Sequence, residues 1–120
     1  MQENRIKDLI RFFWKFGFQP IEIRGSKYLN TPKNIGDYQI DIVAKRNDTY
    51  AIGIIVNDNE FENQNNLIKK ISFLASLKNK YNSKDIYLFL GCSKDNFENL
   101  KRLLNFVTQK YIHKIKVFYL

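Results

Sequence analysis

The sequence predicts an α/β domain in which helices flank a mixed β-sheet, and three observations lead to this class. Segments with helical periodicity and β-branched runs alternate along the chain in the order αβββαβαβ. Two of the runs are joined by a short polar segment, as in an antiparallel hairpin. The second of these runs is apolar at nearly every position, which is typical of a central strand covered on both faces. A hairpin followed by helical crossovers predicts a mixed sheet.

The first half of the chain contains the segments that form the hairpin. Apolar residues recur at helical spacing up to Gly17, which favours the end of a helix. Shorter alternating or β-branched runs follow. These patterns predict, in order, a helix over residues 3–16, a strand over 19–24, a loop over 25–36, and hairpin strands over 38–44 and 50–56 joined by 45–49.

The second half repeats the alternation of helix and strand. Ser93 follows a β-branched run and precedes a helical pattern, so it is a candidate helix cap. The patterns predict a helix over residues 62–80, a strand over 85–90, a helix over 97–107 and a strand over 115–120.

Length and composition favour one folded domain over residues 1–120. The chain is 44% hydrophobic and 15% aromatic, which argues against disorder. Charged residues interrupt every apolar stretch before the ~20 residues that cross a bilayer, so we expect no membrane association. The first residues are charged and predict no secretion signal. A single cysteine, Cys92, excludes an intrachain disulfide, and we expect a cytoplasmic protein.

The net charge of +8 is unevenly distributed. Residues 34–62 hold six acidic and two basic side chains, whereas the segments on either side are basic. A basic surface around a locally acidic segment is typical of a nucleic-acid-binding protein whose anionic centre holds, or once held, a metal ion. This pattern predicts DNA as a partner.

One motif lies in the predicted hairpin. Residues 36–45 read Gly-Asp-Tyr-Gln-Ile-Asp-Ile-Val-Ala-Lys, and residues 50–56 read Tyr-Ala-Ile-Gly-Ile-Ile-Val. Over residues 5–90 the chain resembles the PD-(D/E)XK nuclease superfamily, above all archaeal Holliday-junction resolvases and Mrr-type restriction endonucleases. The resemblance implies a restriction-endonuclease-like core.

The resemblance also implies where a nuclease site would lie. In that superfamily an Asp opens the hairpin, and a Glu or Gln and a Lys two residues later follow on the next strand, around Mg²⁺ or Mn²⁺. Asp41 matches the Asp, but the second and third positions fall on Gly53 and Ile55. A further Glu of the resolvases, on the first helix, falls near Ile6. We therefore expect a catalytically inactive protein without a cofactor that serves as a nucleic-acid-binding or structural subunit in DNA repair, recombination or a mobile-element system.

A second hypothesis retains enzyme activity. Asp37 and Glu60 are near enough in sequence to approach Asp41, as are Asp58 and Glu62. With relocated carboxylates the protein would be a Mg²⁺- or Mn²⁺-dependent DNA endonuclease, with Asp41 as a metal ligand.

Two groups of basic residues are candidates for phosphate contacts. The first lies in the loop after the second predicted element and includes Tyr28, an aromatic suited to base stacking. The second lies on the predicted helix over 62–80. The candidate nucleic-acid-binding residues are Arg24, Lys27, Lys33, Lys69 and Lys70.

The first helix has more aromatic surface than one buried face explains. Phe12, Trp14 and Phe16 widen its apolar arc, so either the final strand or another subunit covers them. They are the candidate interface residues of a homo- or hetero-oligomer. A third hypothesis follows, in which the chain is a protein-interaction subunit of a catalytically active nuclease partner.

Overall fold

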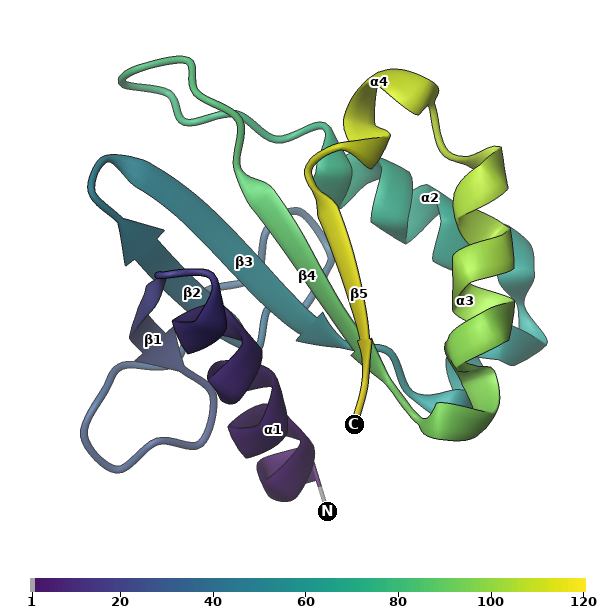
Figure 1. The fold of residues 1–120 in the computed structure, drawn as a ribbon, viewed down its shortest axis with the longest axis horizontal. Helices are drawn as coiled ribbons and strands as arrows, with labels where there is room; N and C mark the ends of the chain where they lie inside the picture. Colours follow the sequence, from purple (N-terminus) through teal and green to yellow (C-terminus); the bar gives the residue numbers. More distant parts are fainter. Residues whose placement is uncertain (1) are drawn as a thin grey trace.

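The computed structural model describes the backbone of residues 2–120 and the side chains from Asn4 onward. A five-stranded sheet with the order β1-β2-β3-β4-β5 forms its centre (Figure 1). β1 to β3 pair antiparallel, whereas β3, β4 and β5 pair parallel, so the predicted mixed sheet is confirmed. The strands are β1 (Gln19–Ile23), β2 (Ile42–Arg46), β3 (Thr49–Ile55), β4 (Tyr87–Cys92) and β5 (Ile115–Tyr119).

Helices cover both faces of this sheet. α1 lies on one face, and α2, α3 and α4 lie on the other (Figure 1). Within the described residues, no helix combines the length and the apolar character that crossing a bilayer needs. The helices are α1 (Gln2–Lys15), α2 (Gln64–Ala75), α3 (Phe97–Leu103) and α4 (Gln109–Ile112), with 3-10 turns η1 (Asp58–Glu62), η2 (Lys94–Asn96) and η3 (Leu104–Phe106). α4 was not expected from the sequence.

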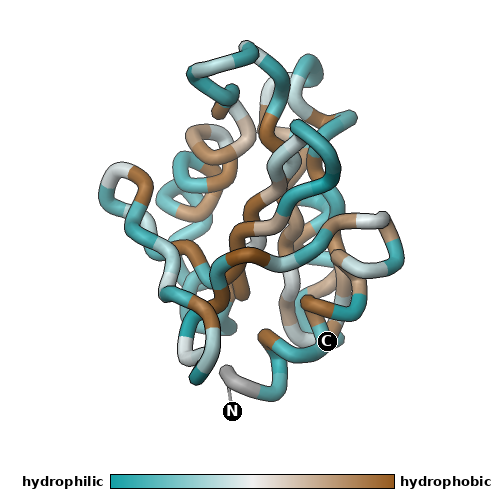
Figure 2. Tube along the Cα trace, turned by 90° about the vertical axis from the view of Figure 1, so that its left-hand side faces the viewer, coloured by the Kyte–Doolittle hydropathy of each residue, from teal (hydrophilic) through white to brown (hydrophobic). Residues whose placement is uncertain are grey.

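The sheet separates two hydrophobic cores. Leu9 and Phe13 of α1 pack against Ile55 and Phe89 on one face. Leu67, Ile71 and Leu74 of α2 pack with the strands on the other face. Figure 2 shows the hydrophobic residues gathered along the central strands and the hydrophilic ones in the outer loops. Burial on both faces explains why β3 is apolar at successive positions.

The predicted hairpin forms, but its first strand starts later than expected. The expected strand over 38–44 is replaced by β2, and only Asn47 and Asp48 join the two strands. Asn47 has a φ of 55°, a conformation that Asn tolerates better than most residues. Before β2, Tyr38 pairs with Ile35 across a tight turn. Residues 35–38 therefore form a local turn and do not lengthen the β2–β3 ladder.

The other helices are shorter than their patterns predict. The Asn63 side chain accepts a hydrogen bond from the backbone N–H of Asn66, which fixes the start of α2. α2 ends at Ala75, where the Ser76 hydroxyl donates to the Phe73 carbonyl, rather than near residue 80. Ser93 is the N-cap residue of η2 rather than of α3, and its side chain makes no capping hydrogen bond, because its hydroxyl donates to Asp58 Oδ1 at 2.8 Å.

Candidate functional site

Asp41 is the residue that matches the nuclease motif, and it lies buried directly before β2 with 4% of its surface exposed. Its Oδ2 accepts a 2.8 Å hydrogen bond from the backbone N–H of Ile55. Its backbone N–H donates to the Gly53 carbonyl at 3.0 Å. The carboxylate therefore ties the approach to β2 onto the end of β3.

Arg24 supplies the opposite charge. Its Nε lies 3.3 Å from Asp41 Oδ1, and its Nη2 donates to the Ile40 carbonyl at 2.7 Å. The backbone N–H of Arg24 donates to the Asp41 carbonyl at 2.8 Å, so two segments are held by side chain and backbone together. Arg24 was expected to contact nucleic acid, but its guanidinium is turned inward onto Asp41.

Gly53 and Ile55 stand at the two remaining hairpin positions of the motif, and both positions are surrounded by apolar side chains. A Cβ atom added at Gly53 would lie 2.7 Å from the Phe13 ring and 3.2 Å from Leu9 Cδ2. The Phe13 ring is stacked on Phe89 with centroids 4.1 Å apart. Ile55 is buried in the same apolar cluster under α1. The space in which a carboxylate and a lysine would stand is filled with hydrocarbon.

These residues do not fit a divalent cation. Mg²⁺ and Mn²⁺ need several oxygen ligands, and Asp41 offers one carboxylate whose oxygens face the Ile55 N–H and the Arg24 guanidinium. Ile6, at the position of the additional helix carboxylate, is buried and apolar. Among the described residues, no three His, Cys, Asp or Glu side chains gather closely enough to hold a metal ion.

Two of the candidate relocated carboxylates line a cavity that does not include Asp41. Asp37 and Glu60 both line a cavity of about 310 Å³ beside α2, together with Gln39 and Lys70, but Asp41 is not among its lining residues. Glu60 Oε1 lies 2.9 Å from Lys70 Nζ, and Oε2 accepts from the Asn57 N–H. Lys70, a candidate for phosphate contacts, is thus paired with a carboxylate and only 16% exposed.

No protein family model, no curated protein and no solved structure matches this chain. The functional interpretation therefore depends on the geometry of its own residues.

A second cavity, of about 380 Å³, lies between α1 and the loop that follows β1. Ile6, Ile10 and Ile23 form its apolar part. Tyr28 and Lys27 line it from the loop and are exposed to solvent, Tyr28 to 93%. Figure 1 shows this loop beside α1. The structure thus brings two of the candidate nucleic-acid-binding residues, Arg24 and Lys27, together with Tyr28 to one concave site.

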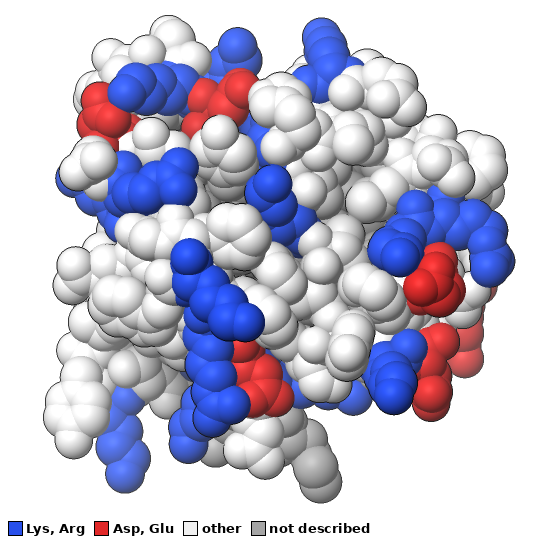
Figure 3. All heavy atoms as spheres, viewed as in Figure 1, with Lys and Arg blue, Asp and Glu red and all other residues white. Residues whose placement is uncertain are grey.

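Lys7 lines this cavity too and was not recognised as a site residue in the sequence. Lys7, Arg11 and Lys15 recur every fourth residue along α1 and are exposed, so they share its outer face. Figure 3 shows lysine and arginine side chains following α1. Asp8, 3.8 Å from Arg11, is an acidic interruption. The helical spacing of these three cations was the sequence pattern that could have identified Lys7 as a site residue.

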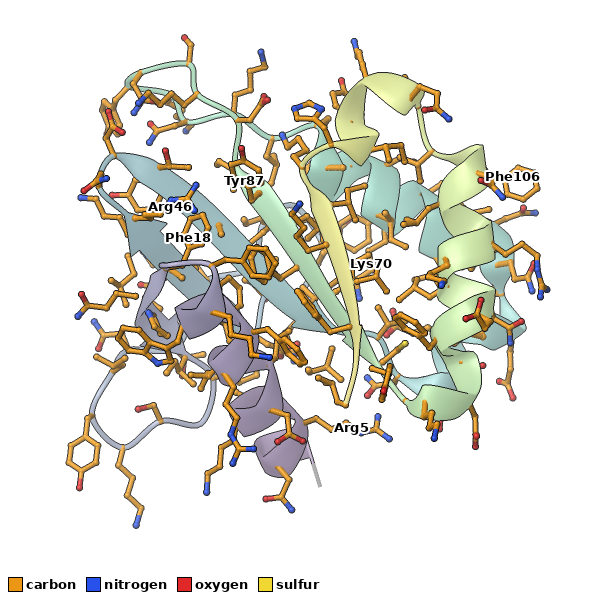
Figure 4. The ribbon with its side chains drawn as sticks, viewed as in Figure 1. Arg5, Phe18, Arg46, Lys70, Tyr87 and Phe106 are labelled. Atoms are coloured by element: carbon orange, nitrogen blue, oxygen red, sulfur yellow. The ribbon has the colours of Figure 1, made fainter. Side chains whose placement is uncertain are left out.

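The remaining candidate lysines lie apart from this face. Lys33 is exposed in the loop before β2, and Lys69 is exposed on α2, which covers the opposite face of the sheet. Arg46 lies over the Phe18 ring, 4.4 Å from its centroid, and donates to the Phe16 carbonyl (Figure 4). The expected basic residues therefore do not form one continuous surface.

The aromatic surplus of α1 is partly covered by the final strand. Phe12 stacks on Phe118 of β5 with centroids 4.1 Å apart, and Phe16 contacts Phe118 edge-on. Trp14 remains 57% exposed. Of the three candidate interface residues, Trp14 is the one with most surface left for a partner.

A charged cluster links β4 to the approach to β5. The Lys114 side chain is fully buried and donates to the Leu77 carbonyl at 2.7 Å, while Asp85 lies within 4 Å of Lys114, His113 and Lys78. Partial burial would raise the pKa of Asp85, but the His113 hydrogen bond and the Lys114 and Lys78 charges together hold that pKa below its ordinary value.

This cluster predicts acid sensitivity. A carboxyl whose pKa is lowered by folding stabilises the protein above its ordinary pKa of 3.8, and this contribution disappears as the pH falls through and below that value. We expect the free energy of unfolding to fall less steeply with acid in Asp85→Asn than in the unmodified protein. Urea unfolding between about pH 3 and pH 6 measures this, with Asp37→Asn as an exposed control. Equal slopes for all three proteins would contradict it.

Proposed function

We propose that this chain is a catalytically inactive relative of the PD-(D/E)XK nucleases, with a restriction-endonuclease-like core, that binds nucleic acid without cleaving it. The observation that carries the proposal is the filling of the motif positions. The Asp41 carboxylate is paired with the Arg24 guanidinium, and Phe13 occupies the space beside Gly53. On this proposal, the fold has lost the residues that hydrolyse the nucleic-acid backbone and has kept a surface that binds nucleic acid.

The charge distribution supports the binding half of the proposal. The net charge is +8, and three cations share the outer face of α1. When lysine and arginine neutralise phosphates, condensed counterions are released, which gives affinity without base specificity. We place the protein in DNA repair, recombination or a mobile-element system as a binding or structural subunit.

We expect salt-dependent binding of DNA and no cleavage. For about three phosphate contacts, the affinity falls roughly 40-fold between 50 and 200 mM salt, because log K changes with a slope of about −0.9 per phosphate. Fluorescence anisotropy of labelled duplex and single-stranded DNA measures the binding. Gel electrophoresis of the same samples with Mg²⁺ or Mn²⁺ measures the cleavage, for which we expect no product.

Matched charge reversals locate the surface. Lys27→Glu is expected to weaken binding several-fold, whereas Lys110→Glu, on α4 across the sheet, changes it little. Metal-dependent cleavage would overturn the proposal in favour of an endonuclease that uses relocated carboxylates. Absence of binding, together with a mass that rises with protein concentration, would favour the protein-interaction subunit, for which Trp14 is the exposed contact.

A further inference from the structure

The cavity between α1 and the loop after β1 has two chemically different parts. Ile6, Ile10 and Ile23 make one part apolar. Lys7, Lys27 and Tyr28 stand at its exposed side. Its volume of about 380 Å³ lies in the range of roughly 300–1,000 Å³ that small-molecule sites occupy. It is thus suited to a ligand with a flat apolar part and an adjacent anion.

The loop that carries Tyr28 is held in shape locally. The Ser26 hydroxyl accepts hydrogen bonds from the backbone N–H groups of Tyr28 and Leu29 at 3.1 and 3.0 Å. Gly25 has a φ of 77°, a conformation that favours glycine, and turns the chain directly after Arg24. Arg24 is in turn fixed to Asp41. The Tyr28 backbone is therefore positioned before a ligand arrives, and its ring is free to stack.

The charge of the cavity selects an anion. Arg24 also lines it, but its guanidinium is paired with Asp41, so Lys7 and Lys27 are the cations available to a ligand. No carboxylate lines the cavity among the side chains that the structure describes. A phosphate next to a stacked base meets both requirements at once.

We propose that this cavity takes one unpaired nucleotide of a single-stranded nucleic acid. The base enters the apolar part against Tyr28, and Lys7 and Lys27 bind the adjacent phosphate. A base inside a duplex is stacked and paired on both sides and cannot enter without the cost of extrusion, so single strands are favoured. The inference rests on the proposed function and adds to it the kind of strand that is bound.

The test separates base stacking from phosphate attraction. Anisotropy titrations use an oligothymidine of about 12 nucleotides, an abasic oligomer of equal length, and the matching duplex. The protein is expected to bind the oligothymidine at least about fivefold more tightly than the abasic oligomer. Tyr28→Ala removes this difference, whereas Tyr28→Phe retains it.

Tyr81→Ala is the matched control, because Tyr81 is 97% exposed on the loop that follows α2, away from the cavity. Both alanine variants replace a solvent-exposed ring, and equal thermal melting curves confirm that the fold is unchanged. Lys7→Ala is expected to weaken both single strands equally, since it removes a phosphate contact; Lys69→Ala is its control.

The outcomes distinguish the two proposals. Equal affinity for oligothymidine and the abasic oligomer, or an unchanged difference in Tyr28→Ala, overturns the nucleotide cavity while leaving binding without cleavage intact. Tighter binding of the duplex than of the oligothymidine also overturns it. Absence of binding to all three ligands overturns the proposed function and the cavity together.

Discussion

Replacing Asp41 with alanine is expected to destabilise the protein by about 3–5 kcal/mol. The substitution leaves the inward-facing Arg24 guanidinium without its counter-charge and the buried N–H of Ile55 without its acceptor. Urea denaturation followed by circular dichroism measures the loss. A catalytic aspartate at a solvated metal site would behave differently, because its removal relieves repulsion between clustered carboxylates. The prediction therefore separates a structural role of Asp41 from a catalytic one.

Two further variants make the test specific. Asp37→Ala removes an exposed carboxylate four residues earlier and is expected to change stability by less than about 0.5 kcal/mol. Arg24→Ala is expected to be destabilising too, and the double variant with Asp41→Ala should cost less than the sum of the single changes, because the two side chains act as a pair. Additive losses, or a stable Asp41→Ala protein, would contradict the structural role.

Apart from the short α4, the order of helices and strands and the mixed sheet were predictable because local patterns indicate them. The spacing of apolar residues in α1 reflects the burial of one helix face, and the apolar run in β3 reflects the burial of both strand faces. The sequence displays both patterns directly. Element ends were less predictable. Directly before β2, the Ile40 carbonyl accepts a hydrogen bond from the Arg24 side chain, a contact that spans 16 residues and that no local pattern displays.

For the candidate site, the sequence displays which residues stand at the motif positions but not what surrounds them. Gly53 and Ile55 could be recognised as departures from the motif because each is a single residue at a fixed spacing. The sequence could not show that Phe13 fills the space beside Gly53, because this contact depends on how α1 packs against the sheet. Arg24 reads as a loop cation in sequence, and only its distance to Asp41 assigns it to the interior.

Lys7 and Tyr28 are a second example of a contact between distant segments that local sequence patterns do not show. They are 21 positions apart and meet at one cavity because the loop after β1 folds back along α1. Tyr28 was suspected from its basic neighbours, whereas Lys7 belonged to a helix whose apolar face dominated its pattern. A concave site made by two elements cannot be found from the periodicity of either one.

Placing a carboxylate at the second motif position, Gly53→Glu, is expected to destabilise the protein by more than about 4 kcal/mol and to produce no nuclease activity. The new side chain meets the Phe13 ring and buries a charge among hydrocarbon without a partner. Because this variant is expected to unfold, Gly53→Ala gives the quantitative measurement. It adds only the Cβ, 2.7 Å from the ring, and should cost about 1–3 kcal/mol in urea denaturation.

The cause of that cost can be isolated in a Phe13→Leu background. Leucine lacks the two ring atoms that lie within 3.0 Å of the added Cβ, so Gly53→Ala should then cost markedly less or become neutral. The dependence on Phe13 identifies close packing, rather than a special backbone conformation of glycine, as the reason for the missing side chain. An equal cost in both backgrounds would contradict this. A stable Gly53→Glu protein that cleaves DNA with Mg²⁺ would show that α1 moves aside and that a metal site can form beside Asp41.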